Sequence, residues 1–132
     1  MIELHTGSTE DKTYVSYCLQ KLGRDWVLYI TGGEPHIGSV ACTEKTGDTV
    51  EFHQLTLRRH KEDAIVRQAL DRLKEMLDGE ILVVGGIHYD DIEGDQVRQI
   101  EQNCTLLLDQ LAANLRDNRP CREGGIIDQI IL

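Results

Sequence analysis

Three short segments of the chain combine glycine, histidine and charged residues in patterns that could bind an anion. The first segment is GGEPHIGS at residues 32–39. Glycine adopts positive φ readily, so successive backbone N–H groups can converge on an anion, and His36 and Ser39 would add side-chain donors. The same residues also suit a plain turn in which glycine and Pro35 have only a geometric role. The GxxxxGK[ST] spacing of a P-loop is absent.

The second segment is RRHKED at residues 58–63, where a predicted strand gives way to a predicted helix. A helix N-terminus offers free N–H groups and the positive end of the dipole. Four basic or titratable side chains arrive there in a chain whose net charge is −9. The alternative is a solvated first turn in which Glu62 and Asp63 only compensate the dipole.

The third segment is GGIHYDDI at residues 85–92, which follows a strongly apolar run and places His88 and Asp90 at its end. Two glycines inside a strand suggest close approach by a ligand or by another backbone. The alternative is a loop in which Asp90 or Asp91 caps the next helix. Capping does not explain Gly85, Gly86 or His88, so the pattern favours a binding role.

Other kinds of chemistry have weaker support in the sequence. His36, His60, His88 and Asp90 are suitable metal ligands, but none has a diagnostic spacing such as HExxH, and no metal site is predicted. A serine nucleophile would need a GxSxG turn, which is absent. The cysteines are widely spaced without a CxxC pair and are predicted to be free, mainly buried thiols: Cys18, Cys42, Cys104 and Cys121.

The elements that must position these segments follow from hydrophobic periodicity and turn residues. Residues 1–12 are expected to be frayed or to form an edge strand. Four strands are predicted at residues 13–20, 25–31, 37–43 and 49–57, the first two as a hairpin and the last with a possible bulge. The run ILVVGGI at residues 81–87 is predicted to be the central strand, covered on both faces.

Two amphipathic helices are predicted at residues 60–78 and 95–117, where apolar residues recur at three- and four-residue intervals. Residues 118–132 are predicted to be a loop and an apolar tail, either a terminal strand of the same sheet or a segment that docks on a partner. The order of elements predicts one α+β domain over residues 1–132. Its antiparallel or mixed sheet of five to six strands would carry both long helices on one face.

Composition limits the classes of partner. The chain has 23 acidic and 14 basic residues, so its field repels nucleic acid and anionic membranes. No stretch approaches the roughly 18 apolar residues that span a bilayer, and the first residues lack a signal-like apolar run. A soluble, cytoplasmic protein is therefore expected.

Taken together, GGEPHIGSVA, HKED at the start of a helix and VVGGIHYDDI resemble the LpdD-like prenylated-flavin chaperone family. This resemblance implies a dimeric protein, similar in shape to proteasome assembly chaperones, that binds prenylated FMN or FMN. It would deliver the flavin to a UbiD-type decarboxylase and would not be an enzyme. The cofactor-binding residues that the resemblance implies are Gly33, His36, Gly38, Ser39, His60, Lys61, Asp63, Gly86, His88 and Asp90.

A flavin would also need apolar or aromatic walls for its ring, for which Trp26, Tyr29 and Tyr89 are candidates. Two alternatives remain open at this stage. One is a small metal-dependent or acid–base enzyme that uses His36, His88 and Asp90. The other is an assembly or scaffold protein that binds no ligand and docks through its apolar tail.

Overall fold

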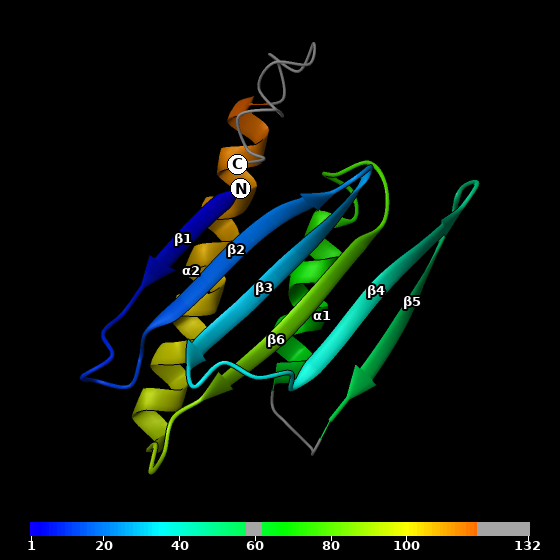
Figure 1. Cartoon of the computed structure of the whole chain (residues 1–132). Helices are drawn as coiled ribbons and strands as arrows, with labels where there is room; N and C mark the ends of the chain where they lie inside the picture. Colours follow the sequence, from blue (N-terminus) through cyan, green and yellow to red (C-terminus); the bar gives the residue numbers. More distant parts are fainter. Residues whose placement is uncertain (58–61, 119–132) are drawn as a thin grey trace.

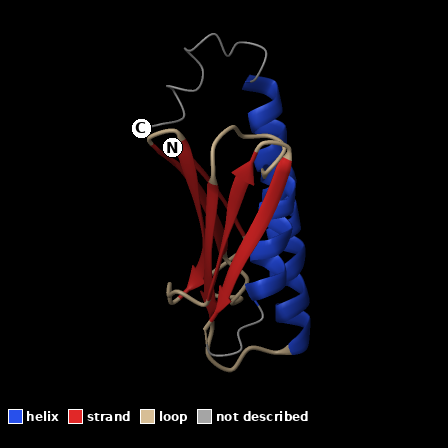
Figure 2. Cartoon of the chain, turned by 90° about the vertical axis from the view of Figure 1, so that its right-hand side faces the viewer, coloured by secondary structure: helices blue, strands red, loops and turns tan. Residues whose placement is uncertain are grey.

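Six strands form one mixed sheet, and two helices lie side by side on one of its faces (Figures 1 and 2). The computed structural model describes residues 1–57 and 62–118. The predicted α+β class and the placement of both helices on one face are confirmed. The elements are β1 Ile2–Thr6, β2 Val15–Leu22, β3 Asp25–Gly33, β4 Ser39–Thr46, β5 Thr49–Thr56, α1 Glu62–Leu73, β6 Ile81–His88 and α2 Gly94–Asn118.

The strand order is β1-β2-β3-β6-β4-β5, in which only β3 and β6 are parallel neighbours. Because β6 lies between β3 and β4, the connection from β3 to β4 must cross the end of β6. The C-terminal ends of β3 and β6, the start of β4 and the start of α1 therefore meet at one edge of the sheet (Figure 1). This edge carries the first and third segments of the sequence analysis.

The core lies between the sheet and the helices. Alternate residues of β2, β3 and β6 point toward the helices, which present the apolar stripes expected from their periodicity. The buried side chains with the largest volumes include Tyr17, Leu19, Leu28, Ile30, Leu70, Leu73, Ile81, Leu107 and Leu111. Within the described ranges, no helix is both long and apolar enough to cross a membrane.

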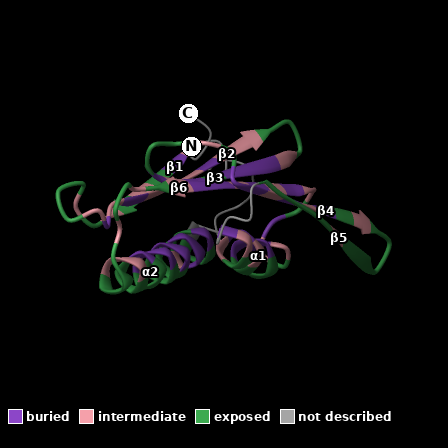
Figure 3. Cartoon of the chain, turned by 90° about the horizontal axis from the view of Figure 1, so that it is seen from below, coloured by how far each residue is buried: buried purple, intermediate pink, exposed green. Residues whose placement is uncertain are grey.

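Among the residues that the structure describes, both helices lie on one face of the sheet and none on the other (Figure 3). The central strand was predicted to be covered on both faces, and the described helices cover one. In β6, Ile81 and Val83 are buried under the helices, whereas Leu82 and Val84 lie half-buried on the bare face. The strand is apolar from Ile81 to Ile87, and its residues on the second face are partly buried rather than exposed.

The N-terminal residues form the edge strand β1, which confirms one of the two arrangements expected for residues 1–12. The β4–β5 pairing runs from Ser39–Thr56 to Thr46–Thr49 without the predicted bulge. Helix α1 ends at Leu73 rather than at residue 78. Beyond this end, Lys45 Nζ donates hydrogen bonds to the carbonyls of Lys74 and Leu77 at 3.0 and 2.9 Å, which satisfies acceptors of the last turn. The predicted C-terminal tail lies outside the described residues.

Candidate functional site

The connection between β3 and β4 brings the first and third segments into direct contact. Gly33 pairs with His88 in the parallel ladder of β3 and β6. Beyond that pair, the N–H of Glu34 donates to the carbonyl of His88 at 3.0 Å, and the N–H of Gly38 donates to the carbonyl of Gly85 at 2.9 Å. Residues that are far apart in the sequence therefore form one continuous backbone layer.

Close approach of this connection explains a glycine in the third segment. A Cβ atom on Gly86 would overlap the backbone carbonyl of His36. The N–H groups of Glu34 and Gly38 are already used within the protein, so they are not free to surround an anion. The packing of the connection onto β6 therefore fits the alternative of a turn in which the glycines have a geometric role.

Two histidines meet at this edge. The ring centroids of His36 and His88 are 6.2 Å apart, and the rings are nearly perpendicular at 85°. His88 Nε2 donates to Asp90 Oδ1 at 2.9 Å. His36 Nδ1 is 3.1 Å from the carbonyl oxygen of Glu34, which can only accept, so Nδ1 carries a proton. The predicted residues His36, His88 and Asp90 are thus brought together.

A buried carboxylate that the sequence analysis did not select completes this group. The Glu62 side chain is 6% exposed, and its Oε1 lies 3.9 Å from His36 Nε2. The same oxygen accepts a hydrogen bond from the N–H of Ile87 at 3.2 Å. A Cβ on Gly38 would lie only 3.0 Å from Glu62 Oε2, so glycine at position 38 leaves room for the carboxylate.

Periodicity offered a signal for Glu62. Its position is four residues before Val66 and seven before Ala69, which places it on the buried stripe of α1. An acidic residue in the first turn of a helix usually faces solvent and compensates the dipole. The sequence analysis therefore interpreted Glu62 as an exposed residue, whereas its side chain is buried.

A pocket of about 490 Å³ opens beside these residues, between the N-terminal halves of α1 and α2 and the end of β6. Its walls are mostly aliphatic, with two carboxylates, one histidine and one tyrosine among them. The lining residues are Glu62, Ala64, Ile65, Ile87, His88, Tyr89, Ile92, Val97, Ile100 and Glu101. The pocket therefore offers an apolar surface with a few hydrogen-bonding groups.

One of the three aromatic candidates lines the pocket. Tyr89 donates its hydroxyl to the carbonyl of Tyr14 at 2.6 Å, and burial raises the pKa of this phenol. Trp26 lies at the opposite end of β3, where its Nε1 donates to the carbonyl of Asp78. Tyr29 lies on the bare face of the sheet, half-way along β3. Trp26 and Tyr29 are therefore not walls of this pocket.

The other predicted site residues have different surroundings. Ser39 is fully buried, and its hydroxyl lies 3.4 Å from Gln54 Nε2, which also donates to the backbone carbonyl of Asp63 at 3.1 Å. Asp90 is exposed, and its carbonyl accepts a hydrogen bond from Lys12 Nζ at 2.7 Å. His60 and Lys61 lie outside the described residues.

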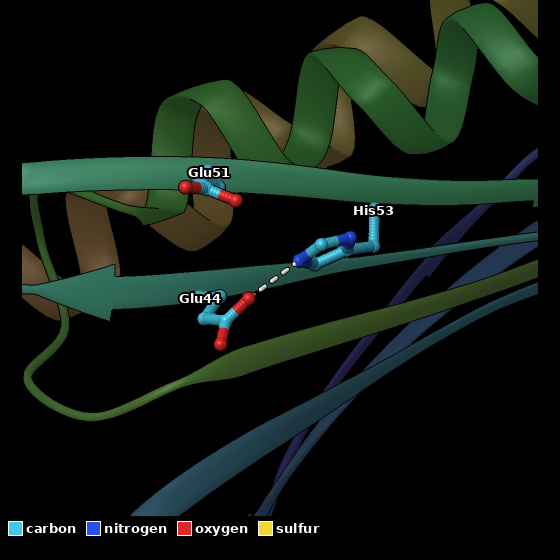
Figure 4. Close-up of side chains that lie close together, drawn as sticks. All are labelled: Glu44, Glu51 and His53. Carbon is cyan, nitrogen blue, oxygen red and sulfur yellow. Dashed lines mark hydrogen bonds and ion pairs between the residues drawn. The ribbon is translucent and has the colours of Figure 1, made fainter.

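A separate group on the β4–β5 hairpin has the residue types of a metal site (Figure 4). The ligand atoms of Glu44, Glu51 and His53 lie within 4.8 Å of one another, and His53 Nε2 is 2.8 Å from Glu44 Oε1. All three side chains are exposed. Among the described residues, no such group of three includes His36 or His88, so the metal-dependent alternative gains no support at the candidate site.

Comparisons with known proteins agree with this architecture. The family model described as "Prenylated flavin chaperone LpdD-like domain" matches residues 9–116. The chain is 32% identical over 96 residues to Protein LpdD of Lactiplantibacillus plantarum, which covers 70% of this chain and 71% of that protein.

The fold also resembles a chain in the crystal structure of a chaperone complex for yeast 20S proteasome assembly. The TM-score is 0.54 at 11% identity, over 86% of this chain and 95% of that chain, and this similarity concerns the fold alone. The match to the family model extends from the loop before β2 to the last turns of α2. It therefore includes His36 and His88, which meet at the end of β6, and the pocket beside them. The chain therefore belongs to the LpdD-like prenylated flavin chaperone family.

Proposed function

We propose that this protein is a non-catalytic chaperone that binds prenylated FMN, or FMN, and delivers it to a UbiD-type decarboxylase. One observation carries the proposal. Two histidines from separate segments meet above the buried carboxylate of Glu62, and a pocket of about 490 Å³ opens beside them. Membership of a family described as prenylated flavin chaperones supplies the class of ligand.

The pocket suits the ring of a flavin. Ligand pockets usually measure about 300–1,000 Å³ and are mainly apolar, with a few polar groups that orient the ligand. Ile65, Ile87 and Ile92 provide aliphatic walls, and Tyr89 provides an aromatic one. Reduced flavins react with oxygen, so a carrier that encloses the ring protects it during transfer.

The phosphate requires a different location. Among the described residues, none that lines the pocket is a lysine or an arginine, and two of them are glutamates. We therefore assign the phosphate to the N-terminus of α1, since His60 and Lys61 directly precede Glu62 in the sequence. The remaining family-derived residues, Gly33 and Asp63 among them, would shape this edge.

We further propose that the protein acts as a cytoplasmic homodimer joined through the bare face of the sheet. Half-buried apolar side chains occupy the middle of that face, including Val40 on β4 and Leu82 and Val84 on β6. Tyr29 on β3 is 39% exposed there. A second copy would cover these side chains and leave the helices and the pocket on the outside.

Anaerobic calorimetry with prenylated FMN tests the binding function. The wild-type protein should bind one flavin per chain, and His88→Ala should weaken binding by about tenfold, the loss expected for one well-placed polar contact. His53→Ala, on the hairpin away from the pocket, is the matched control and should bind as the wild type does. Absence of binding by the wild type, or equal losses in both variants, would contradict the proposal.

Delivery requires its own measurement. Flavin-loaded protein mixed with apo-decarboxylase should restore decarboxylation, whereas the loaded protein alone should convert no substrate. Free prenylated FMN at the same concentration is the control for spontaneous uptake. If decarboxylase activity returns no faster than with the free flavin, the protein stores the flavin but does not deliver it, and the delivery role is contradicted.

A further inference from the structure

Two carboxylates lie opposite one another on the β4–β5 hairpin, outside the pocket. Glu44 and Glu51 are direct cross-strand partners, so their side chains lie on the same face of the sheet. Like charges in this arrangement destabilise a strand pair. Among the described residues, no lysine or arginine forms an ion pair with either glutamate. A cation bound between the two carboxylates would remove the repulsion.

His53 adds a nitrogen donor on the same face. It follows Glu51 by two residues in β5, so the two side chains project to one side of the sheet. His53 Nε2 is 2.8 Å from Glu44 Oε1, and Figure 4 shows the ring directed at that carboxylate. One ligand atom from each of the three residues lies within 4.8 Å of the others.

This spacing is close to that of ligands on a single metal ion. Bonds to Zn²⁺ measure about 2.1 Å, so two ligand atoms at a tetrahedral angle lie about 3.4 Å apart. Glutamate side chains have several rotatable bonds, so small rotations of Glu44 and Glu51 would bring all three ligand atoms to this separation. All three side chains are exposed, which lets an ion reach them directly from solvent.

The imidazole determines which kind of ion fits. One histidine nitrogen with two carboxylates suits borderline divalent ions such as Zn²⁺, whereas Ca²⁺ and Mg²⁺ are bound through oxygen atoms. When His53 Nε2 donates to Glu44, it carries the imidazole proton. A bound ion would occupy the position of that proton on Nε2, and the neutral ring would carry its proton on Nδ1.

We propose that Glu44, Glu51 and His53 form a binding site for one Zn²⁺ ion, with water completing the coordination. The site needs both strands of the hairpin, because Glu44 comes from β4 and the other two ligands come from β5. Strand β5 is the last of the sheet and pairs with β4 alone. The ion therefore holds this edge strand in register, and it stabilises the folded protein because the unfolded chain lacks the preformed site.

Calorimetric titration of the metal-free protein with Zn²⁺ tests the site. The wild type should bind one ion per chain, and His53→Ala and Glu44→Gln should each weaken binding by at least about tenfold, a loss typical of changes around a bound metal. His5→Ala is the matched control, because it removes an exposed histidine from β1, the edge strand at the other side of the sheet, and it should bind as the wild type does.

Thermal unfolding provides a second measurement. Zn²⁺ should raise the melting temperature of the wild type and of His5→Ala, and it should leave that of His53→Ala unchanged. Absence of Zn²⁺ binding by the wild type overturns the proposal. Equal binding to His53→Ala and wild type, or Ca²⁺ binding as tight as that of Zn²⁺, overturns it too, because either result indicates general attraction of cations to an acidic surface. The flavin-binding function does not depend on these outcomes.

Discussion

At the scale of single residues, contacts across the β3–β4 connection explain the glycines of the motifs. Gly86 lies directly beneath the backbone of His36, and Gly38 lies against the carboxylate of Glu62. Both are sites where a side chain would displace the groups that define the candidate site. The glycines thus allow the close packing that brings His36, His88 and Glu62 together.

Gly86→Ala is therefore expected to destabilise the protein. The added Cβ would overlap the His36 carbonyl, so the connection must move, at a cost of about 1–3 kcal/mol in the free energy of unfolding. Urea denaturation measures this loss. Gly94→Ala is the matched control, because its Cβ would meet only Arg98 Nη1 at 3.7 Å, and alanine at a helix end should change stability by less than about 1 kcal/mol. Equal stability of Gly86→Ala and wild type would contradict the packing described here.

At the scale of elements, α2 and β2 are joined by a buried pair of ionisable groups. Burial raises the pKa of the Cys104 thiol to about 12, and burial together with the nearby thiol raises the pKa of the Tyr17 phenol. Both groups are neutral when the protein is folded. Because their folded-state pKa values exceed the unfolded ones, their contribution to stability is complete below the unfolded pKa and is lost as the pH rises above it.

Replacement of Cys104 should reduce the loss of folding stability at alkaline pH. The thiol has an ordinary pKa of 9.0, so the affected range runs from there to the folded value of about 12. In Cys104→Ala, the free energy of unfolding should fall less steeply through this range, by up to about 1.4 kcal/mol per pH unit. Denaturation at a series of pH values measures the slope. Cys18→Ala, which alters a half-buried thiol, should change the slope less, and parallel curves for Cys104→Ala and wild type would contradict the prediction.

The elements were predictable where local patterns determine them, and not where distant residues do. Alternation and helical periodicity predicted the strands and both helices. The end of α1 was predicted too late in the chain. The contacts beyond Leu73, where Lys45 of the β4–β5 hairpin donates to the carbonyls of Lys74 and Leu77, join segments that no local pattern connects. The meeting of His36 with His88 depends on β6 inserting between β3 and β4, which no local pattern reveals. The pocket was not predicted, because its walls are ordinary core aliphatics from three elements.

At the scale of the whole molecule, both described helices lie on one face of the sheet, and no described element covers the middle of the other face. Val84→Glu places a charge among the half-buried apolar residues of that face and should convert the proposed dimer into a monomer, since a buried unpaired charge costs several kcal/mol. Sedimentation velocity measures the change. Leu106→Glu, at an exposed position of α2, is the control and should remain dimeric. A monomeric wild type, or a Val84→Glu dimer, would contradict the proposed interface.

The pocket opens on the helix side of the sheet, away from that bare face. In a dimer built on the bare face, the two flavin sites would lie back to back on outer surfaces, separated by two sheets. Each site would be formed by residues of one subunit alone. Flavin titrations should therefore follow a simple hyperbola with a Hill coefficient of about one. Each subunit of such a dimer would then transfer its flavin to a separate decarboxylase independently of the other subunit.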